Sequence, residues 1–358
     1  MSNTARDILI PSDTSIFRIA FLYVGQGDAT LLVVPDGGSF RFLLVDTNVD
    51  KERGGIDMVA LLTDLLDEEL GAFINTHPHS DHVRGVKAIH DAVGIKEVWH
   101  SAHVPGKKHK DAYDELLEVI KDIGTENEYE LRGTREENTL EQNEEPCEHP
   151  IGEPSYNVLS PADYVKEDIE GEKPEDRARR IHEQCGVIRF VYGEDAKAVL
   201  LTGDSDRTAW EDRITDYHKE RLPSDVLSAS HHGSRTFFKK DEDDDDPYKG
   251  HMDEITPTYI VISAPKQSES PHDHPHDDAI EIYKEYVNSD DILHLGANRE
   301  CVIVDIDGDG NVTVTTDTEL VDEYGFDGEE DDDGRSAAAT GPFVHKSSTG
   351  DKTPRRYG

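Results

Sequence analysis

One short segment constrains this chain more than any other part of its sequence. Residues 76–82 read Thr-His-Pro-His-Ser-Asp-His and directly follow a short apolar run. Imidazoles and carboxylates are the ligands that zinc and similar cations prefer. Alternation along an extended chain sends His77 and His79 to the same side. Asp81 and His82, at the turn into the next helix, can point to an adjacent position. A solvated polar loop is the other interpretation, but this placement between a buried strand and a helix favours two neighbouring metal ions.

Strands and helices alternate around this segment. Period-two apolar runs and β-branched residues predict strands over 16–23, 29–34, 41–46, 72–75, 96–100, 156–159, 187–192, 198–202, 225–229 and 259–263, and a hairpin over 300–316. Apolar residues at helical spacing predict helices over 56–70, 83–93, 111–123, 206–217 and 278–287. Strand pairs occur at both ends of this pattern. It therefore predicts an α/β fold, a four-layer αββα sandwich of two mixed β-sheets flanked by helices.

The same pattern predicts one domain over residues 16–320, which fits the usual size of a domain. We expect an N-terminal extension over 1–15 and a disordered acidic and polar tail over 321–358, because the tail carries no pattern that would pack. Polar, acidic and aperiodic stretches inside the domain predict surface insertions. These insertions are expected near 124–154, 166–180 and 239–254.

The charge balance is strongly acidic, with 37 Lys+Arg against 78 Asp+Glu and a formal net charge of −41. This balance argues against a protein that holds nucleic acid or anionic lipid by bulk charge attraction. Because the acidic residues are spread along the whole chain, the composition is typical of a halophilic protein, whose self-repulsion is screened in molar salt. An acidic protein from ordinary salt is the alternative.

The sequence also bears on the compartment. Three cysteines cannot form a disulfide framework, which favours a reducing environment. No apolar run approaches the length of a membrane helix, and the N-terminus lacks the pattern of a signal peptide. We therefore expect a cytoplasmic protein without membrane insertion, and the sequence indicates no stable protein partner.

Four further motifs narrow the interpretation. They are Val24-Gly25-Gln26-Gly27-Asp28-Ala29, Leu44-Val45-Asp46-Thr47, Leu201-Thr202-Gly203-Asp204 and His231-His232-Gly233-Ser234. With the 76–82 segment, they resemble the metallo-β-lactamase superfamily, and in this order they resemble the lactamase-like domain of the DNA-uptake protein ComEC and its stand-alone relatives. The resemblance covers residues 16–316. It implies two divalent metal ions, Zn²⁺ by preference and Mn²⁺ as the alternative.

The resemblance also implies how the ligands are shared between the two ions. His77 and His79 belong to the first metal site, and Asp81 and His82 belong to the second. Asp204, at the end of a strand, supplies a bridging carboxylate that offsets the repulsion between two close cations. A strand-end cap is the alternative role for this aspartate.

Two positions complete the implied ligand set, with alternatives left open. Either His231 or His232 closes the second metal site, and we favour His231 as the ligand and His232 as a supporting or proton-transfer group. His182 precedes the strand over 187–192 at the spacing of a third histidine for the first site, although ComEC-like domains often carry a different residue there. If His182 instead belongs to the polar stretch around it, the first site keeps an open position.

The remaining candidates flank the metal ligands. Residues 270–277 resemble the segment before the last helix of ComEC-like domains, so His274 either reaches the substrate or lies in an ordinary helix N-terminal loop. Ser234 and Arg235 follow the histidine pair and are candidates for contact with a substrate phosphate. The residues expected to support ligand histidines from behind are Asp28 and Asp46.

The implied function is metal-dependent hydrolysis at a dinuclear site with a bridging hydroxide, with Asp81, His232 and His274 as catalytic residues. The resemblance points to phosphodiesters, either DNA or a nucleotide or small phosphodiester. A hydrolase of a non-phosphate ester, thioester or lactone on the same fold is the alternative. A non-catalytic interaction module is less favoured, because every residue of the metal motif is present.

Overall fold

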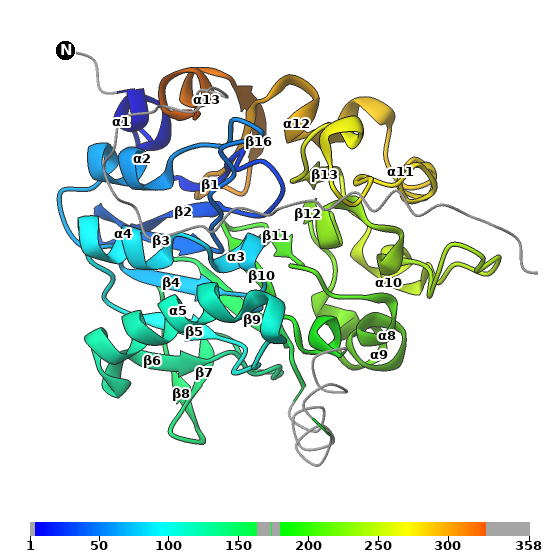
Figure 1. Ribbon diagram of the computed structural model, residues 1–358, viewed down its shortest axis with the longest axis horizontal. Helices are drawn as coiled ribbons and strands as arrows, with labels where there is room; N and C mark the ends of the chain where they lie inside the picture. The colour runs from blue at the N-terminus through cyan, green and yellow to red at the C-terminus, as the bar shows by residue number, and fades with distance from the viewer. Residues whose placement is uncertain (1–3, 163–172, 174–179, 327–358) are drawn as a thin grey trace, which may run out of the picture. The chain divides into compact units, whose positions relative to one another are not determined.

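The computed structural model describes residues 4–162, 173 and 180–326. Over this range the chain forms two β-sheets packed face to face, with helices on both outer faces (Figure 1). The predicted four-layer αββα sandwich is confirmed. The tail beyond residue 326 and most of the predicted insertion over 166–180 lie outside the described residues. None of the described helices has the length and apolar character needed to cross a membrane.

The first sheet has ten strands in the order β16-β15-β1-β2-β3-β4-β5-β6-β7-β8. Their bounds are β1 (Phe17–Phe21), β2 (Thr30–Asp36), β3 (Ser39–Val45), β4 (Ala72–Asn75), β5 (Val98–His100), β6 (Glu128–Glu130), β7 (Thr139–Gln142), β8 (Glu145–Glu148), β15 (Cys301–Ile306) and β16 (Val312–Asp317). Strands β3 to β6 run parallel, and the other pairs are antiparallel. Gly37 and Gly38 join β2 to β3 with φ values of 57° and 87°, as a tight two-residue hairpin requires.

The second sheet has six strands in the order β14-β13-β12-β11-β10-β9. Their bounds are β9 (Ser155–Ser160), β10 (Val187–Tyr192), β11 (Lys197–Leu201), β12 (Val226–Ser228), β13 (Tyr259–Ile262) and β14 (Ile292–His294). Strands β11 to β14 run parallel, whereas β9 and β10 pair antiparallel. Both sheets are therefore mixed, as the sequence predicts.

Period-two alternation within the strands builds the layers. In β1, Phe17 and Ile19 enter the core between the two sheets, while Ala20 faces the outer helices. In β11, Val199 enters the inter-sheet core and Leu200 faces the helices of the other side. Successive side chains of a strand point to opposite faces, so strands buried on both faces must be apolar almost throughout.

Helices cover both outer faces (Figure 1). Those whose buried residues pack on the first sheet are α1 (Thr4–Leu9), α2 (Met58–Leu65), α3 (Ser80–Val83), α4 (Val86–Val93), α5 (Lys110–Ile123) and α13 (Glu319–Tyr324). Those on the side of the second sheet are α8 (Arg207–Ala209), α9 (Thr215–His218), α10 (Gly250–Ile255) and α11 (Asp277–Tyr283), while α12 (Leu295–Asn298) contributes to the inter-sheet core. Asp57 caps α2, where its carboxylate accepts from the backbone N–H groups of Val59 and Ala60.

The structure differs from the sequence-based expectation over 124–154. This stretch reads as aperiodic, but it contains β6, β7 and β8, which extend the first sheet at its edge. Leu140 packs into the inter-sheet core from an otherwise polar strand. Edge strands tolerate charged residues because one side of the strand faces solvent. A single apolar residue per strand is too weak a signal for period-two analysis.

Candidate metal centre

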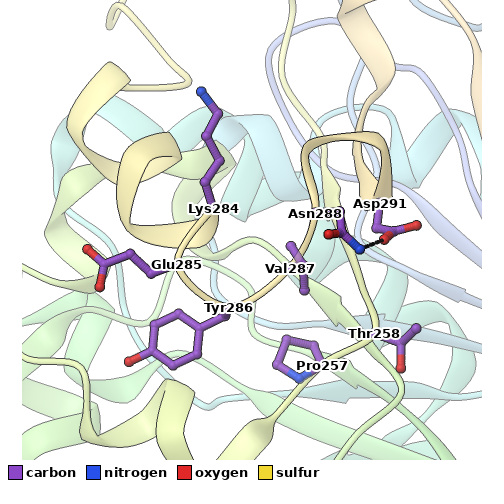
Figure 2. Close-up of a pocket in the computed structure, with 8 residues that line it drawn as sticks. All are labelled: Pro257, Thr258, Lys284, Glu285, Tyr286, Val287, Asn288 and Asp291. Carbon is purple, nitrogen blue, oxygen red and sulfur yellow. Dashed lines mark hydrogen bonds between the residues drawn. The ribbon is translucent and has the colours of Figure 1, made fainter.

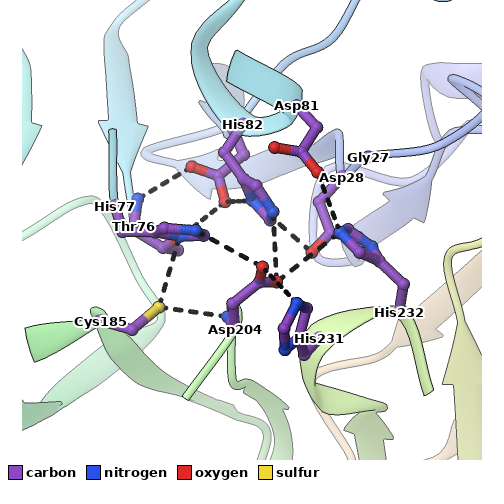
Figure 3. A network of polar contacts seen from close by, with 12 residues as sticks. Gly27, Asp28, Thr76, His77, Asp81, His82, Cys185, Asp204, His231 and His232 are labelled. Carbon is purple, nitrogen blue, oxygen red and sulfur yellow. Dashed lines mark hydrogen bonds and ion pairs between the residues drawn. The ribbon is translucent and has the colours of Figure 1, made fainter. Parts of the chain in front are cut away.

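The residues of the candidate site converge from one edge of both sheets, where parallel strands end (Figure 3). His77 follows β4, Asp204 follows β11 and His232 follows β12. Two other contributors come from strands that run the opposite way. Asp28 precedes β2, whose start lies beside the end of β3, and His182 precedes β10, whose start lies beside the end of β11. The topology therefore gathers residues from both halves of the chain at one edge.

The first cluster of potential ligands contains His77, His79, His182 and Asp204, whose ligand atoms all lie within 4.8 Å of one another. The Nε2 atom of His77 lies 3.5 Å from Oδ2 of Asp204. The Nε2 atom of His182 lies 3.9 Å from the same oxygen. The structure therefore brings His182 to the position that the sequence resemblance implies.

The second cluster contains Asp28, His82, Asp204 and His232, again within 4.8 Å. The Nε2 atom of His82 lies 3.2 Å from Oδ1 of Asp204, and Nε2 of His232 lies 3.7 Å from it. One oxygen of Asp204 thus faces each cluster. This is the arrangement needed of a carboxylate that bridges two cations.

The buried polar atoms of both clusters fit metal ions. Five of them have no hydrogen-bond partner among the described residues, namely Nε2 of His77, His82, His182 and His232 and Oδ1 of Asp204. A buried polar atom without a partner costs roughly 1–3 kcal/mol. Here these atoms converge, and a cation at each cluster would satisfy several of them at once. The mixture of imidazoles with a shared carboxylate suits zinc or a similar divalent ion.

The electrostatics of the site favour the ligand forms of Asp204 and His77. Burial would raise the pKa of Asp204, but the surrounding histidines, His231 and His82 foremost, lower it well below its ordinary value. Burial lowers the pKa of His77 to about 4. The carboxylate is therefore ionised and this imidazole is neutral near pH 7, as metal binding requires. Burial would lower the pKa of His82 and of His232, but Asp204 and the other carboxylates around them raise it well above its ordinary value, so each of these two imidazoles must release a proton to bind a cation.

Asp46 supports the second cluster from behind. Its Oδ2 lies 2.8 Å from Nδ1 of His82, and it accepts a hydrogen bond of 2.6 Å from the Thr76 hydroxyl. Its Oδ1 accepts from the Thr76 backbone N–H at 2.8 Å and from Asn75 Nδ2 at 3.1 Å. A carboxylate on the far nitrogen of a ligand histidine fixes its tautomer and orientation. This geometry agrees with the supporting role proposed for Asp46.

The structure separates the paired histidines. His232 belongs to the second cluster, and its Nδ1 donates to the Ser263 carbonyl at 2.9 Å. His231 lies outside both four-residue clusters, although its Nε2 is 3.5 Å from Oδ2 of Asp204 and its Nδ1 is 3.0 Å from the Thr236 hydroxyl. Both residues have positive φ values, 52° and 58°, and their ring centroids lie 6.0 Å apart. The geometry therefore favours His232 as the ligand, whereas the sequence favours His231.

The carboxylates also differ from the sequence-based assignment. Asp28, expected as a support, contributes an oxygen to the second cluster. Asp81 borders that cluster, with its Oδ2 3.6 Å from Nε2 of His232 (Figure 3). The two aspartates flank different nitrogens of the His232 ring, because Oδ1 of Asp28 lies 3.5 Å from its Nδ1 and Asp81 faces its Nε2.

The predicted substrate contacts have protein partners. The Arg235 guanidinium lies 3.2 Å from Oδ1 of Asp278 and 3.5 Å from Oε2 of Glu242. The buried Ser234 hydroxyl accepts from the Thr236 backbone N–H and hydroxyl. His274 is buried, and its ring lies 5.2 Å from that of His231. The His274 ring also lies 5.9 Å from the ring of His232, which belongs to the second cluster.

Two residues beside the metal clusters could not be singled out from the sequence. The buried Cys185 accepts a hydrogen bond of 3.2 Å from the Asp204 backbone N–H, and its Sγ lies 3.6 Å from Nδ1 of His77. His109 stacks on His79 with 4.1 Å between ring centroids, and its Nδ1 accepts from the Ser80 backbone N–H. Neither residue belongs to a recognisable motif, and only the folded chain places them there.

A surface hollow of about 310 Å³ lies elsewhere (Figure 2). Pro257 and Thr258 line it just before β13, and Asp291 lines it just before β14. It therefore lies at the starts of parallel strands, whereas the metal clusters lie at their ends. Ligand sites of α/β sheets occur at the carboxyl ends of strands, so this hollow is not the candidate site.

Comparison with known proteins defines the class. Residues 22–241 match the metallo-β-lactamase superfamily, and this span is more than half of the chain. The protein therefore belongs to the metallo-β-lactamase superfamily, with a fold of two mixed sheets flanked by helices and two His/Asp clusters that could each hold a metal ion. No curated protein matches the chain significantly.

Solved structures with a similar fold are distant. A diiron β-hydroxylase from Streptomyces venezuelae, CmlA, is 16% identical with a TM-score of 0.43, and the match covers 78% of this chain and 52% of that one. A metallo hydrolase from the archaeon Ignicoccus hospitalis is 11% identical with a TM-score of 0.45, covering 83% and 98%. A diphosphatase of the PhnP family is 12% identical with a TM-score of 0.39, covering 84% and 99%. At these identities the likeness concerns the fold and not the substrate.

Proposed function

We propose that the protein is a zinc-dependent hydrolase that cleaves phosphodiesters at the dinuclear site. The observation that carries the hydrolase proposal is the convergence of unpartnered buried ligand atoms on the two sides of Asp204. Bound divalent ions would lower the pKa of a water, hold it as a nucleophile and stabilise charge on the reacting oxygens. Mn²⁺ is the alternative ion, because the same ligands accept it.

We assign the ligands as follows. His77, His79 and His182 hold the first ion, and Asp204 is shared between the two. For the second ion we assign His232 in place of His231, because His232 belongs to the second cluster and His231 does not. The second ion is therefore held by His82, His232 and Asp81 or Asp28, while His231 borders both sites.

The local charge around the site supports an anionic substrate. Lys107 and Lys108 lie in an exposed 3₁₀ turn that ends at His109, whose ring covers the ligand His79. Among the described residues, no carboxylate pairs with either lysine. Arg84, directly after α3, is exposed. It donates to Oδ1 of Asn48 and to the Val49 carbonyl, and the Glu115 carboxylate lies within its electrostatic range. We call Arg84, Lys107 and Lys108 the cationic rim.

The cationic rim lies close to the metal clusters. Burial lowers the pKa of His109, and the positive charges of Lys108 and Arg84 lower it further, so both cations are within electrostatic reach of this ring. In a chain with a net charge of −41, a group of cations beside the site favours a phosphate group over a neutral ester. The motif order shared with ComEC-like domains points to the same substrate class, with DNA and small phosphodiesters as its two members.

The test is a substrate panel with the zinc-loaded full chain in molar KCl. We expect release of p-nitrophenol from bis-p-nitrophenyl phosphate, and linear and plasmid DNA decide between long and short phosphodiesters. Activity in low salt would remove support for the halophilic proposal. Cleavage of a thioester or lactone without any phosphodiesterase activity would contradict the proposed substrate class and favour the alternative hydrolase.

A charge reversal sharpens the same test. At the lowest salt in which the protein stays folded, we expect Lys108→Glu to raise KM for bis-p-nitrophenyl phosphate by roughly 3–10-fold. The effect should shrink in molar KCl, because salt screens the interaction between the charge and the anionic substrate. Lys121→Glu is the matched control, since this exposed lysine lies near the far end of α5, about 16 Å along the helix from its start. Equal effects of the two variants would exclude the cationic rim as a substrate contact.

A further inference from the structure

Two buried side chains next to the second cluster each carry a polar atom without a hydrogen-bond partner among the described residues. These atoms are Nε2 of Gln26 and Nδ1 of His274. Gln26 is only 6% exposed and His274 only 4%. Burying such groups without a partner is unfavourable, so a position like this is a candidate for contact with a bound molecule.

Ser270 joins the two residues into one structure. Its hydroxyl donates to Oε1 of Gln26 at 2.9 Å and accepts from the backbone N–H of His274 at 3.0 Å. Because Ser270 binds the oxygen of the Gln26 carboxamide, the NH₂ group is the end without a hydrogen-bond partner among the described residues. The three residues come from the loop before β2 and the loop before α11, which are far apart in the sequence.

Two hydrogen bonds also hold the backbone of Gln26 in place. Its N–H donates to Oδ2 of Asp50 at 3.0 Å, and its carbonyl accepts from Nδ2 of Asn48 at 2.6 Å. These contacts fix the loop before the ligand reaches it. A preorganised donor binds an incoming oxygen with little loss of conformational entropy.

The pair borders the metal clusters. The His274 ring lies 5.2 Å from the His231 ring and 5.9 Å from the His232 ring. Gln26 stands two residues before Asp28, which contributes to the second cluster. The loop that carries Gln26 therefore adjoins the second cluster, and the His274 ring lies beside the paired histidines.

We propose that Gln26 and His274, positioned by Ser270, form an oxygen-binding subsite for the phosphoryl group of the substrate. The Gln26 Nε2 donates to a non-bridging phosphoryl oxygen, and the His274 ring contacts the same group. Ser270 is a positioning residue that touches only these two. This inference rests on the proposed function and adds to it the residues that recognise the phosphoryl group.

The test measures binding of inorganic phosphate to the zinc-loaded full chain by calorimetry. We expect Gln26→Leu to weaken phosphate binding by roughly 10–100-fold, which is the loss expected for a hydrogen bond to a charged oxygen. Zinc content should remain at the wild-type value. With bis-p-nitrophenyl phosphate, the same variant should lose activity in proportion to its loss of phosphate affinity.

Two further variants keep the test decisive. Gln26→Glu retains the oxygen that Ser270 binds but replaces the NH₂ donor with a carboxylate oxygen, so it should weaken phosphate binding even if Gln26→Leu does not fold. Gln142→Leu is the matched control, because this glutamine lies in β7, next to the edge strand β8, and its Nε2 donates to the Glu126 carbonyl. It should bind phosphate like the wild type.

The outcomes separate the two proposals. If the wild type binds phosphate and the folded, zinc-replete Gln26 variants bind it equally well, the unpartnered atoms serve the structure only and the subsite is overturned. If the zinc-loaded wild type neither binds phosphate nor cleaves a phosphodiester, the proposed substrate class fails and the subsite fails with it.

Discussion

The two metal clusters share Asp204 but differ in how their histidines are supported. In the second cluster, Nδ1 of His82 lies 2.8 Å from the carboxylate of Asp46, and Nδ1 of His232 donates to the Ser263 carbonyl. Each histidine is thus held by a strong acceptor behind it. Such partners orient a ligand ring and raise its basicity.

The first cluster lacks supports of this kind. Nδ1 of His77 faces only the Thr76 hydroxyl at 3.2 Å and the Cys185 thiol at 3.6 Å. His182 lies in a short 3₁₀ turn with 22% of its side chain exposed. The two clusters therefore share a carboxylate but differ in the hydrogen-bond partners of their histidines. We predict that the first cluster binds its ion more weakly than the second.

The largest expected effect comes from the residue that both clusters share. Asp204→Ala should remove both ions and lower phosphodiesterase activity by roughly 10³-fold or more, because the five remaining imidazoles would then hold two cations without the shared carboxylate that offsets their repulsion. Elemental analysis of the purified variant measures the metal content. Asp36→Ala, at an exposed strand end, should keep both ions. Retention of two ions by Asp204→Ala would contradict the shared ligand.

A smaller effect is expected at the exposed ligand of the weaker cluster. His182→Ala should reduce the zinc content from two ions to one per chain, because only the first cluster loses a ligand. The remaining ion should keep its wild-type affinity in a competition titration with a chelator. If the variant instead kept both ions at unchanged affinity, His182 would be an ordinary residue of the turn before β10.

Removing a support should produce a selective change. Asp46→Asn keeps the buried volume but loses the charge behind His82, and should weaken the second ion by roughly 10–100-fold. Zinc titration that resolves two binding steps measures this, and the first ion should be unaffected. Asp57→Asn makes the same chemical change at the cap of α2 and should leave both affinities unchanged. If Asp46→Asn instead weakened binding of the first ion, Asp46 would support the first cluster and not the second.

A buried histidine outside both clusters gives the smallest effect. His251 is fully buried among aromatic rings, including those of Phe237 and Tyr248, and neither ring nitrogen has a hydrogen-bond partner among the described residues. Burial lowers its pKa to about 3. Its unfolded form, with a pKa near 6.5, binds more protons between these values, so its contribution to stability is complete above pH 6.5 and is lost as the pH falls below it.

His251→Phe should remove that pH dependence. Between pH 7.5 and pH 5, the free energy of unfolding of the wild type should fall by about 2 kcal/mol more than that of the variant. Urea unfolding at the two pH values measures the difference, and the other histidines cancel in it. Equal falls for the two proteins would show that His251 is protonated in the folded state. The absence of a described carboxylate partner distinguishes this residue from the buried ligand histidines.

Much of the site could be predicted because its signal is local. His77, His79, Asp81 and His82 lie within one strand end and one helix start, so the sequence alone fixes their neighbourhood. The layered fold was predictable for a similar reason, since strands buried on both faces stand out as apolar runs.

Other parts depend on topology that sequence spacing does not contain. His182 and Asp28 reach the clusters because β10 and β2 run antiparallel to neighbours whose ends carry the main ligands. Sequence spacing does not separate the two adjacent histidines either, because His231 and His232 share one left-handed backbone conformation and only their side-chain contacts differ. Strands β6 to β8 escaped prediction because they lie at a polar edge of the sheet.

The most direct test of the dinuclear site is a calorimetric titration of Zn²⁺ into the metal-free full chain in molar KCl. The geometry predicts two binding steps of unequal affinity, with the weaker step absent in His182→Ala and both steps absent in Asp204→Ala. A single step or no binding in the wild type would contradict a dinuclear centre around Asp204, and two steps that survive the loss of Asp204 would contradict its bridging role.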